Sequence, residues 1–418
     1  MGVAARLGRL SEYDALALTA LVWFLAKFLR YAFPPLFPRF GVEFGVSNAL
    51  LGTAYTVMMT VYALMQFPSG ALADRLGATK VIVGGGLVAA AGALWLVVPV
   101  PRGPVFALPW AGAVPAGFLA LVGGMVLVGL GTGAHKTVAV RLLSRTYPAR
   151  TGRALGVLDT LGAFGGVAAP AAVVLFTDVA DWHALFLAGG LAGVGLAAAV
   201  LARVPRRVPP TPTDADGGGT PAGAYLALFR DRRFALFVLV TLCFSFGYNG
   251  AVAFLPSFLV AVGDLPTETA NLLYSGLFVV SLVQLVTGDL SDRVGHLRVI
   301  GATLALAAAG IAGLLVVGAA GPVVLGAVVV AFGLGSHGFR PVRGAYLTAV
   351  IPDEVAGGGL GVVRTLLMGA GALSPAVVGV IADASGFAPA FGLLAAAMAL
   401  AVLLTGVVAV LGDDATAA

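Results

Sequence analysis

The chain has 418 residues, of which 60% are hydrophobic and 10% are charged, and its formal net charge is +5. Soluble domains are only about half apolar and about one quarter charged, so this composition excludes an ordinary soluble enzyme or nucleic-acid binder. The single cysteine, Cys243, excludes an intramolecular disulfide and a metal site built on spaced cysteines. A lipid bilayer is the expected solvent.

Apolar runs near the length of about 20 residues that crosses a hydrocarbon core recur along the whole chain. Short stretches of Gly, Pro and charge separate them, which predicts twelve membrane-spanning helices; strands of a membrane barrel would instead alternate in polarity over about ten residues. The predicted spans are 14–37, 47–72, 79–98, 113–144, 153–176, 183–204, 232–262, 268–289, 297–317, 322–348, 357–381 and 389–411.

Basic residues predict the orientation of these spans. Cytoplasmic loops of membrane proteins carry an excess of Lys and Arg. If both termini are cytoplasmic, only Arg39 and Arg102 fall on the outer side. The cytoplasmic side then holds Arg6, Arg9, Arg75, Lys80, Arg145, Arg150, Arg153, Arg203, Arg206, Arg207, Arg230, Arg232, Arg233, Arg293 and Arg298.

The stretch from Pro205 to Gly223 is rich in Pro, Gly and charge and has no apolar period, which indicates a flexible linker. We therefore expect a six-helix bundle over 1–204, a cytoplasmic linker over 205–231 and a second six-helix bundle over 232–418.

An internal repeat relates the two halves. GALADRLGATK, from Gly70 to Lys80, returns as GDLSDRVGHLR at a shift of 218. At shifts of 204 and 205, sequences of spans 4 and 5 return in spans 10 and 11, so that Lys136 corresponds to Arg340. Parallel repeats related by an axis along the membrane normal are typical of one transporter architecture.

On these motifs the chain resembles the major facilitator superfamily across essentially its whole length. GALADRLGATK is similar to the superfamily's signature loop after span 2, and GDLSDRVGHLR is similar to its weaker second copy. The resemblance implies an all-α membrane protein with twelve transmembrane helices in two pseudo-symmetric six-helix bundles. It also implies a secondary transporter in the cell membrane that works by alternating access.

In the superfamily the signature loops act as a conformational latch. Glycines permit close helix approach at Gly70 and a tight turn at Gly77, and the resemblance favours the ion pairs Asp74–Arg364 and Asp159–Arg293. Alternatively, Arg75, Lys80, Arg293 and Arg298 only orient their helices. The full set of candidate latch residues is Gly70, Asp74, Arg75, Gly77, Lys80, Asp159, Asp292, Arg293 and Arg364.

Spans 1, 4, 7 and 10 line the central cavity in the superfamily, and in this chain their ionisable residues are basic. Unpaired positive charge in a cleft of low dielectric constant favours an anionic solute, which supplies the missing counter-charge. Arg30 is the leading candidate, because an Arg can hold a carboxylate or phosphate through two parallel hydrogen bonds. The candidate substrate-binding residues are Lys27, Arg30, His135, Lys136, Tyr248, Asn249, Gln284, His337 and Arg340.

Structural roles are open for several of these residues. Lys27 is long enough to extend to the interface, and Lys136 and Arg340 can instead anchor their helices there. His135 and His337 can relay protons, bind solute or simply pack.

The leading function is therefore transport of a small, anionic solute, with a proton or counter-solute as coupling partner and the lipid bilayer as surroundings. A drug or lipophilic-cation exporter of the same fold is the alternative, with Asp159 as its acid. A third hypothesis is a sensor that binds a solute without transporting it. The lack of a sizeable soluble domain counts against this hypothesis. We expect a monomer with no cofactor, no metal, no nucleic-acid partner and no enzymatic activity, since no activated nucleophile or phosphate loop is recognisable.

Overall fold

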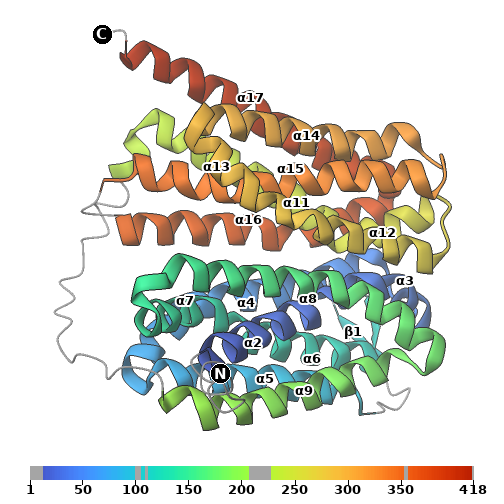
Figure 1. The fold of residues 1–418 in the computed structure, drawn as a ribbon. Coiled ribbons are helices and arrows are strands. Elements are labelled where there is room, and N and C mark those ends of the chain that lie inside the picture. The colour runs from blue at the N-terminus through green and yellow to red at the C-terminus, as the bar shows by residue number, and fades with distance from the viewer. Residues whose placement is uncertain (1–12, 99–104, 109–111, 207–226, 353–355, 417–418) are drawn as a thin grey trace, which may run out of the picture. The chain divides into compact units, whose positions relative to one another are not determined.

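The computed structural model describes residues 13–98, 105–108, 112–206, 227–352 and 356–416 (Figure 1). Twelve of its helical segments are long and apolar enough to cross a membrane, which confirms the predicted all-helical membrane fold. Most boundaries agree with the predicted spans within a few residues. The first span differs most, because it continues to Phe44 instead of ending at residue 37.

The helices of the first half run in Figure 1 from blue to green. They are α2 (Asp14–Tyr31), α3 (Phe33–Phe44), α4 (Asn48–Leu76), α5 (Ala78–Trp95), α6 (Ala116–Gly133), α7 (His135–Thr146), α8 (Thr151–Val179) and α9 (Trp182–Arg203), with 3-10 turns at Pro148–Arg150 and Val204–Arg206.

The helices of the second half run from yellow to red. They are α11 (Arg232–Ala261), α12 (Thr267–Val279), α13 (Gln284–Val294), α14 (His296–Val317), α15 (Pro322–Val350), α16 (Ala356–Ser385) and α17 (Phe387–Thr416), with 3-10 turns at Leu228–Arg230 and Val280–Val283.

Two spans of the first half are interrupted. Helix α2 ends at Tyr31 and α3 begins with Phe33-Pro34-Pro35, as expected of prolines, which lack the N–H that continues a helix but fit its first turn. In span 7 of the second half, Pro256 does not end α11, which continues to Ala261. In span 4, α6 ends at Gly133 and α7 begins at His135, so the break falls directly before the two candidate residues His135 and Lys136.

One short hairpin was not expected. Strands β1 (Val105–Leu108) and β2 (Gly112–Pro115) pair in antiparallel fashion before α6. The predicted fourth span began at residue 113, so its first three residues belong to this hairpin. An apolar run of this kind is read equally well as strand or helix from its sequence.

The chain forms two compact units. The first comprises the described residues of Met1–Val46 and Val57–Asp214, and the second those of Ser47–Thr56 and Ala215–Ala418. The first turns of α4 thus belong to the second unit. There the Asp383 carboxylate accepts hydrogen bonds from the backbone N–H groups of Asn48 (3.0 Å) and Ala49 (2.7 Å) and caps α4.

Each unit has a glycine at the equivalent position of the repeat that lets two spans pack closely. Helix α6 crosses α5 at Gly131, where a Cβ atom would collide with the backbone of Gly85 and Ala89. At the corresponding place, α15 crosses α14 at Gly335, where a Cβ atom would meet Thr303 and Ala307. Small residues allow such backbone approach in membranes, where burial of apolar surface supplies little drive for helix association.

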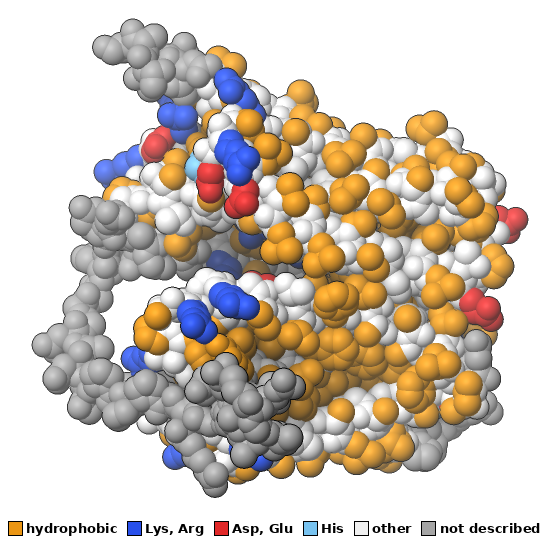
Figure 2. Space-filling view, in the orientation of Figure 1, with side chains coloured by type: hydrophobic (Ala, Val, Ile, Leu, Met, Phe, Trp, Pro, Cys, Tyr) orange, Lys and Arg blue, Asp and Glu red, His pale blue; other side chains and the backbone are white. Residues whose placement is uncertain are grey.

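The outer surface of the helices is apolar. Figure 2 shows hydrophobic side chains over the flanks of the helices and charged side chains gathered toward their ends. Leu64, Val316 and Leu403 are among the large apolar side chains that are more than half exposed. This pattern fits contact with lipid along the flanks and with water at the ends.

We predict that Gly335→Ala lowers the thermal unfolding temperature in detergent, because the added methyl group meets the α14 backbone and overpacking costs about 1–3 kcal/mol. Gly344→Ala on the same helix is the matched control, since open space surrounds that position. Equal unfolding temperatures for the two variants would contradict the close crossing.

Candidate functional site

Three cations of the first unit surround one indole ring. The Lys27 Nζ and Lys136 Nζ atoms each lie 5.6 Å from the ring centre of Trp23, and the Arg30 Cζ atom lies at 5.5 Å. Trp23, Lys27 and Arg30 lie four and three residues apart on α2 and therefore share a face, whereas Lys136 comes from α7. We call Lys27, Arg30 and Lys136 the basic cluster.

Arg30 is the most enclosed cation of the basic cluster, at 5% exposure. Its guanidinium lies 3.8 Å above the ring centre of Tyr62, and its Nε–H donates to the Ala26 carbonyl (3.2 Å). Aromatic faces attract a guanidinium but do not neutralise it. Among the residues that the structure describes, no carboxylate forms an ion pair with Arg30, so its remaining N–H donors suit an anion.

Lys136 corrects the expectation that the basic residues of the cavity spans are unpaired. Its ammonium forms an ion pair with the Asp159 carboxylate of α8. The sequence placed Asp159 in a latch with Arg293, but a lysine whose side chain is only 14% exposed needs a nearby counter-charge. Asp159 itself is 63% exposed.

His135 is placed as a packing residue. Its ring is 3% exposed, stacks on Trp23 at a centroid distance of 5.8 Å, and its Nε2 atom lies 3.1 Å from the Thr19 carbonyl oxygen. The His135 ring therefore fixes Trp23 from the side of α7. These contacts favour the packing role over a proton relay.

The second unit contains a cation on an aromatic ring as well. The Arg340 Cζ atom of α15 lies 4.3 Å from the ring centre of Tyr248 on α11. The ring centre of His337 lies 6.0 Å from that of Tyr248 and 6.2 Å from that of Phe278, and both pairs are edge-to-face.

The amides of Asn249 and Gln284 bond to their own helices. Asn249 Nδ2 donates to the Ser245 carbonyl (2.8 Å), and Gln284 Nε2 donates to the Ser281 carbonyl (2.9 Å). Asn249 also contacts the Ser245 hydroxyl (3.3 Å). Neither amide is joined to Arg340 by a hydrogen bond in the described part of the chain.

The signature loop holds a further ion pair. Asp74 pairs with Arg141 of α7, a partner that the sequence analysis did not consider. Gly77 has φ +91° and the matching Gly295 has φ +97°, a conformation that favours glycine, so both turns require this residue. No atom of its own unit lies within 4 Å of a Cβ atom built at Gly70, so the expected close approach to a helix there stays a prediction.

The other latch candidates are exposed side chains, at helix ends for all but Arg364, which lies about two turns into α16. Asp292 lies 3.8 Å from the Nε2 atom of His296. The pairs Asp74–Arg364 and Asp159–Arg293 would join the two units and stay predictions. The exposed set comprises Arg75, Lys80, Arg293 and Arg364.

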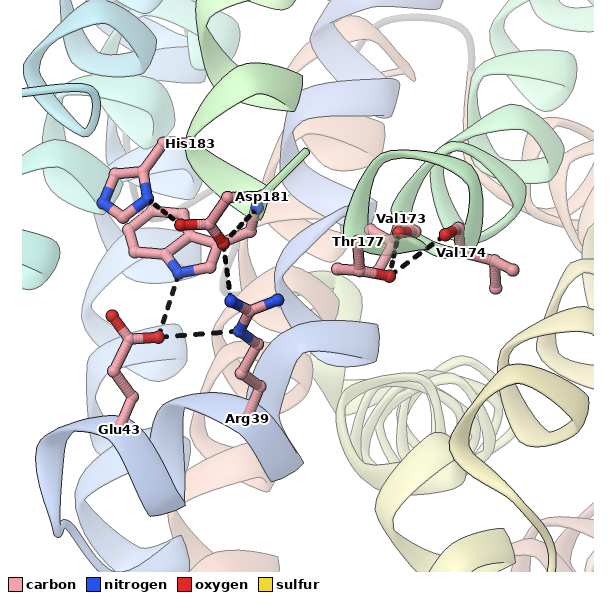
Figure 3. Close-up of polar contacts among 8 residues, drawn as sticks. Arg39, Glu43, Val173, Val174, Thr177, Asp181 and His183 are labelled. Atoms are coloured by element: carbon pink, nitrogen blue, oxygen red, sulfur yellow. Dashed lines mark hydrogen bonds and ion pairs between the residues drawn. The ribbon is translucent and has the colours of Figure 1, made fainter. Parts of the chain in front are cut away.

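A polar network ties the end of α3 to the start of α9 (Figure 3). The Arg39 guanidinium donates to Asp181 (2.6 Å) and lies 3.7 Å from Glu43. Trp182 Nε1 donates to Glu43 (3.0 Å), and His183 Nδ1 lies 2.8 Å from Asp181. We call Arg39, Glu43, Asp181, Trp182 and His183 the α3–α9 network. In it, the positive charge of Arg39 lies beside the carboxylates of Glu43 and Asp181.

Sequence reasoning missed the aromatic partners of the cations. Neither Trp23 nor Tyr62 was among the candidate residues, although Trp23 lies one helical turn before Lys27. That spacing was the available signal for Trp23, whereas Tyr62 lies on another span. Within the described residues, no group of three or more His, Cys, Asp or Glu side chains is arranged to hold a metal ion.

Comparison with known proteins places the chain in a family. The model of the Major Facilitator Superfamily matches residues 19–283 and 266–416. The chain therefore belongs to this superfamily, and it is a multi-pass membrane transporter. A D-xylose–proton symporter of known structure has a TM-score of 0.73 over 94% of this chain and 97% of its own, and its 13% identity supports the fold alone.

Two curated relatives match parts of the chain. A probable sulfoacetate transporter of Cupriavidus necator is 27% identical over 186 residues, which cover 44% of this chain and 40% of the relative. A probable chloroplastic anion transporter of Arabidopsis thaliana is 30% identical over 162 residues, which cover 37% and 27%. The matched regions thus span less than half of either relative.

We predict that Trp23→Leu lowers the thermal unfolding temperature more than Trp23→Phe does. Both changes remove packing, but Phe keeps an aromatic face for the basic cluster, and a cation on such a face contributes about 0.5–2 kcal/mol. Differential scanning fluorimetry in detergent measures the effect. An equal loss in both variants would show that the ring's volume matters and its face does not.

Proposed function

We propose that this transporter moves a small anionic solute by alternating access, with the basic cluster as its anion-binding element. The observation that carries the proposal is the gathering of Lys27, Arg30 and Lys136 around one buried ring. Positive charge held in a medium of low dielectric constant attracts an anion and is stabilised by it. The names of both curated relatives, which refer to sulfoacetate and to anions, support the same solute class.

Arg30 is the proposed principal contact. Its terminal N–H groups can form two parallel charge-assisted hydrogen bonds to a carboxylate, sulfonate or phosphate. The rings of Tyr62 and Trp23 lie 3.8 Å and 5.5 Å from the Arg30 Cζ atom and do not neutralise its charge. In the second unit, Arg340 and Tyr248 form the corresponding candidate contact.

The pairing of Asp159 argues against the alternative of cation export. An exporter of lipophilic cations needs an acid whose charge is available to the drug, whereas Asp159 is already compensated by Lys136. The proposal also includes the cell membrane as location, with both termini in the cytoplasm, and a proton or counter-solute as coupling partner.

We predict that sulfoacetate, acetate or inorganic phosphate raises the unfolding temperature of the purified protein and that Arg30→Gln removes this stabilisation. The loss of a hydrogen bond to a charged group corresponds to about 1.5–3 kcal/mol, or roughly 10- to 150-fold weaker binding. Binding titrations and uptake into proteoliposomes measure the effect.

Arg39→Gln is the matched control, because Arg39 belongs to the α3–α9 network and not to the basic cluster. It is expected to keep anion binding. Stabilisation by lipophilic cations alone, unchanged in Arg30→Gln, would overturn the proposal in favour of cation export.

A further inference from the structure

The ion pair between Lys136 and Asp159 joins two groups in unlike surroundings. The lysine side chain is 14% exposed, whereas the carboxylate is 63% exposed. Asp159 projects from α8, and Lys136 stands in the first turn of α7, directly after the break at Ala134. The pair therefore has one member held within the protein and one member in contact with solvent.

This asymmetry makes Asp159 the member that can leave. A carboxylate that is more than half exposed keeps much of its hydration when it turns away, so that an exposed ion pair contributes little net stability. Lys136 has no such freedom, because an enclosed ammonium without a counter-charge is strongly disfavoured. Another anion must take the place of Asp159 when the carboxylate departs.

Several charges near Asp159 have contacts of their own. From α2, Arg30 and Lys27 lie at the same Trp23 ring as Lys136. From α7, His135 is held at the Thr19 carbonyl. Just before α8, Arg150 donates to the Tyr13 hydroxyl.

We propose that Asp159 occupies, at Lys136, the place that an acidic group of the solute takes during transport. This inference rests on the proposed function of the basic cluster. Asp159 is then a positioning residue that acts through Lys136: it compensates the lysine when the transporter is empty, and the solute displaces it on binding. Its carboxylate competes with the solute and so lowers the affinity.

The exchanged counter-ion has a consequence for the transport cycle. The loaded transporter carries the solute's negative charge at Lys136, and the empty transporter carries that of Asp159. In both forms the enclosed lysine is compensated, which lets the empty protein return without solute. Without Asp159 only the loaded form would be compensated, so exchange of solute would continue while net uptake would slow.

Asp159→Asn tests this inference with sulfoacetate and inorganic phosphate as probes. We expect about two- to five-fold tighter binding, the range that the loss of one exposed competing charge gives. We also expect net uptake into solute-free proteoliposomes to fall about tenfold relative to exchange into preloaded ones. A purely structural role for Asp159 would lower both transport modes together.

Further variants sharpen the test. Asp159→Glu keeps the competing carboxylate and should bind the probes as the wild type does. Asp264→Asn is the matched control, because Asp264 lies in the loop after α11 with φ 51°, a conformation that Asn tolerates, and outside the basic cluster.

If Asp159→Asn unfolds, the Lys136→Gln/Asp159→Asn double variant keeps the inference testable, because it removes the enclosed lysine together with its counter-charge. It should keep the wild-type ratio of net uptake to exchange, and a fall in that ratio would overturn the inference.

The outcomes separate the two proposals. Suppose that the wild type binds the anion through Arg30, but Asp159→Asn binds no more tightly and keeps the wild-type ratio of net uptake to exchange. This result would overturn the proposal that the solute displaces Asp159 and leave the proposed function standing. Absence of anion binding by the wild type would overturn the proposed function and this inference with it.

Discussion

Compensation of positive charge inside an apolar helical bundle is the constraint on which the functional part of this structure depends. Each enclosed cation of the first unit is held by an aromatic face, a carboxylate or both: Arg30 lies on Tyr62 and near Trp23, and Lys136 pairs with Asp159 beside the same indole. An aromatic face stabilises a cation without removing its charge, whereas a carboxylate removes it. Under the proposed function, Arg30 is the cation available to the anion, and Lys136 is the cation that Asp159 occupies in the empty protein.

The surrounding bundle gives these side chains a rigid setting. Backbone contacts at Gly131 and Gly335 bring corresponding helices together in the two units, and the helix break at Ala134 sets the direction from which His135 and Lys136 leave α7. Helix α4 begins among residues of the second unit and continues in the first.

The proposed function follows from chemistry that the fold does not specify. The superfamily carries many kinds of solute on one architecture, so the solute class must be inferred from the residues of the site. A buried guanidinium with free N–H donors selects for a group with two or three acceptor oxygens. In the proposed mechanism, the Asp159 carboxylate paired with Lys136 adds a second condition, because the solute must outcompete it.

The sequence by itself determined the twelve spans, the internal repeat and the basic character of spans 1 and 4, because hydrophobic length and charge are local properties of the chain. The turn at Gly77 followed for the same reason, since its motif lies within a few residues. Only the tertiary structure decided the partners of the side chains: Asp159 with Lys136, Asp74 with Arg141 and Tyr62 beneath Arg30. These partners come from different helices, and whether they meet depends on the rotation of each helix about its axis and on breaks such as that at Ala134. Packing against neighbouring helices sets both, and a periodic pattern along one helix does not contain that information.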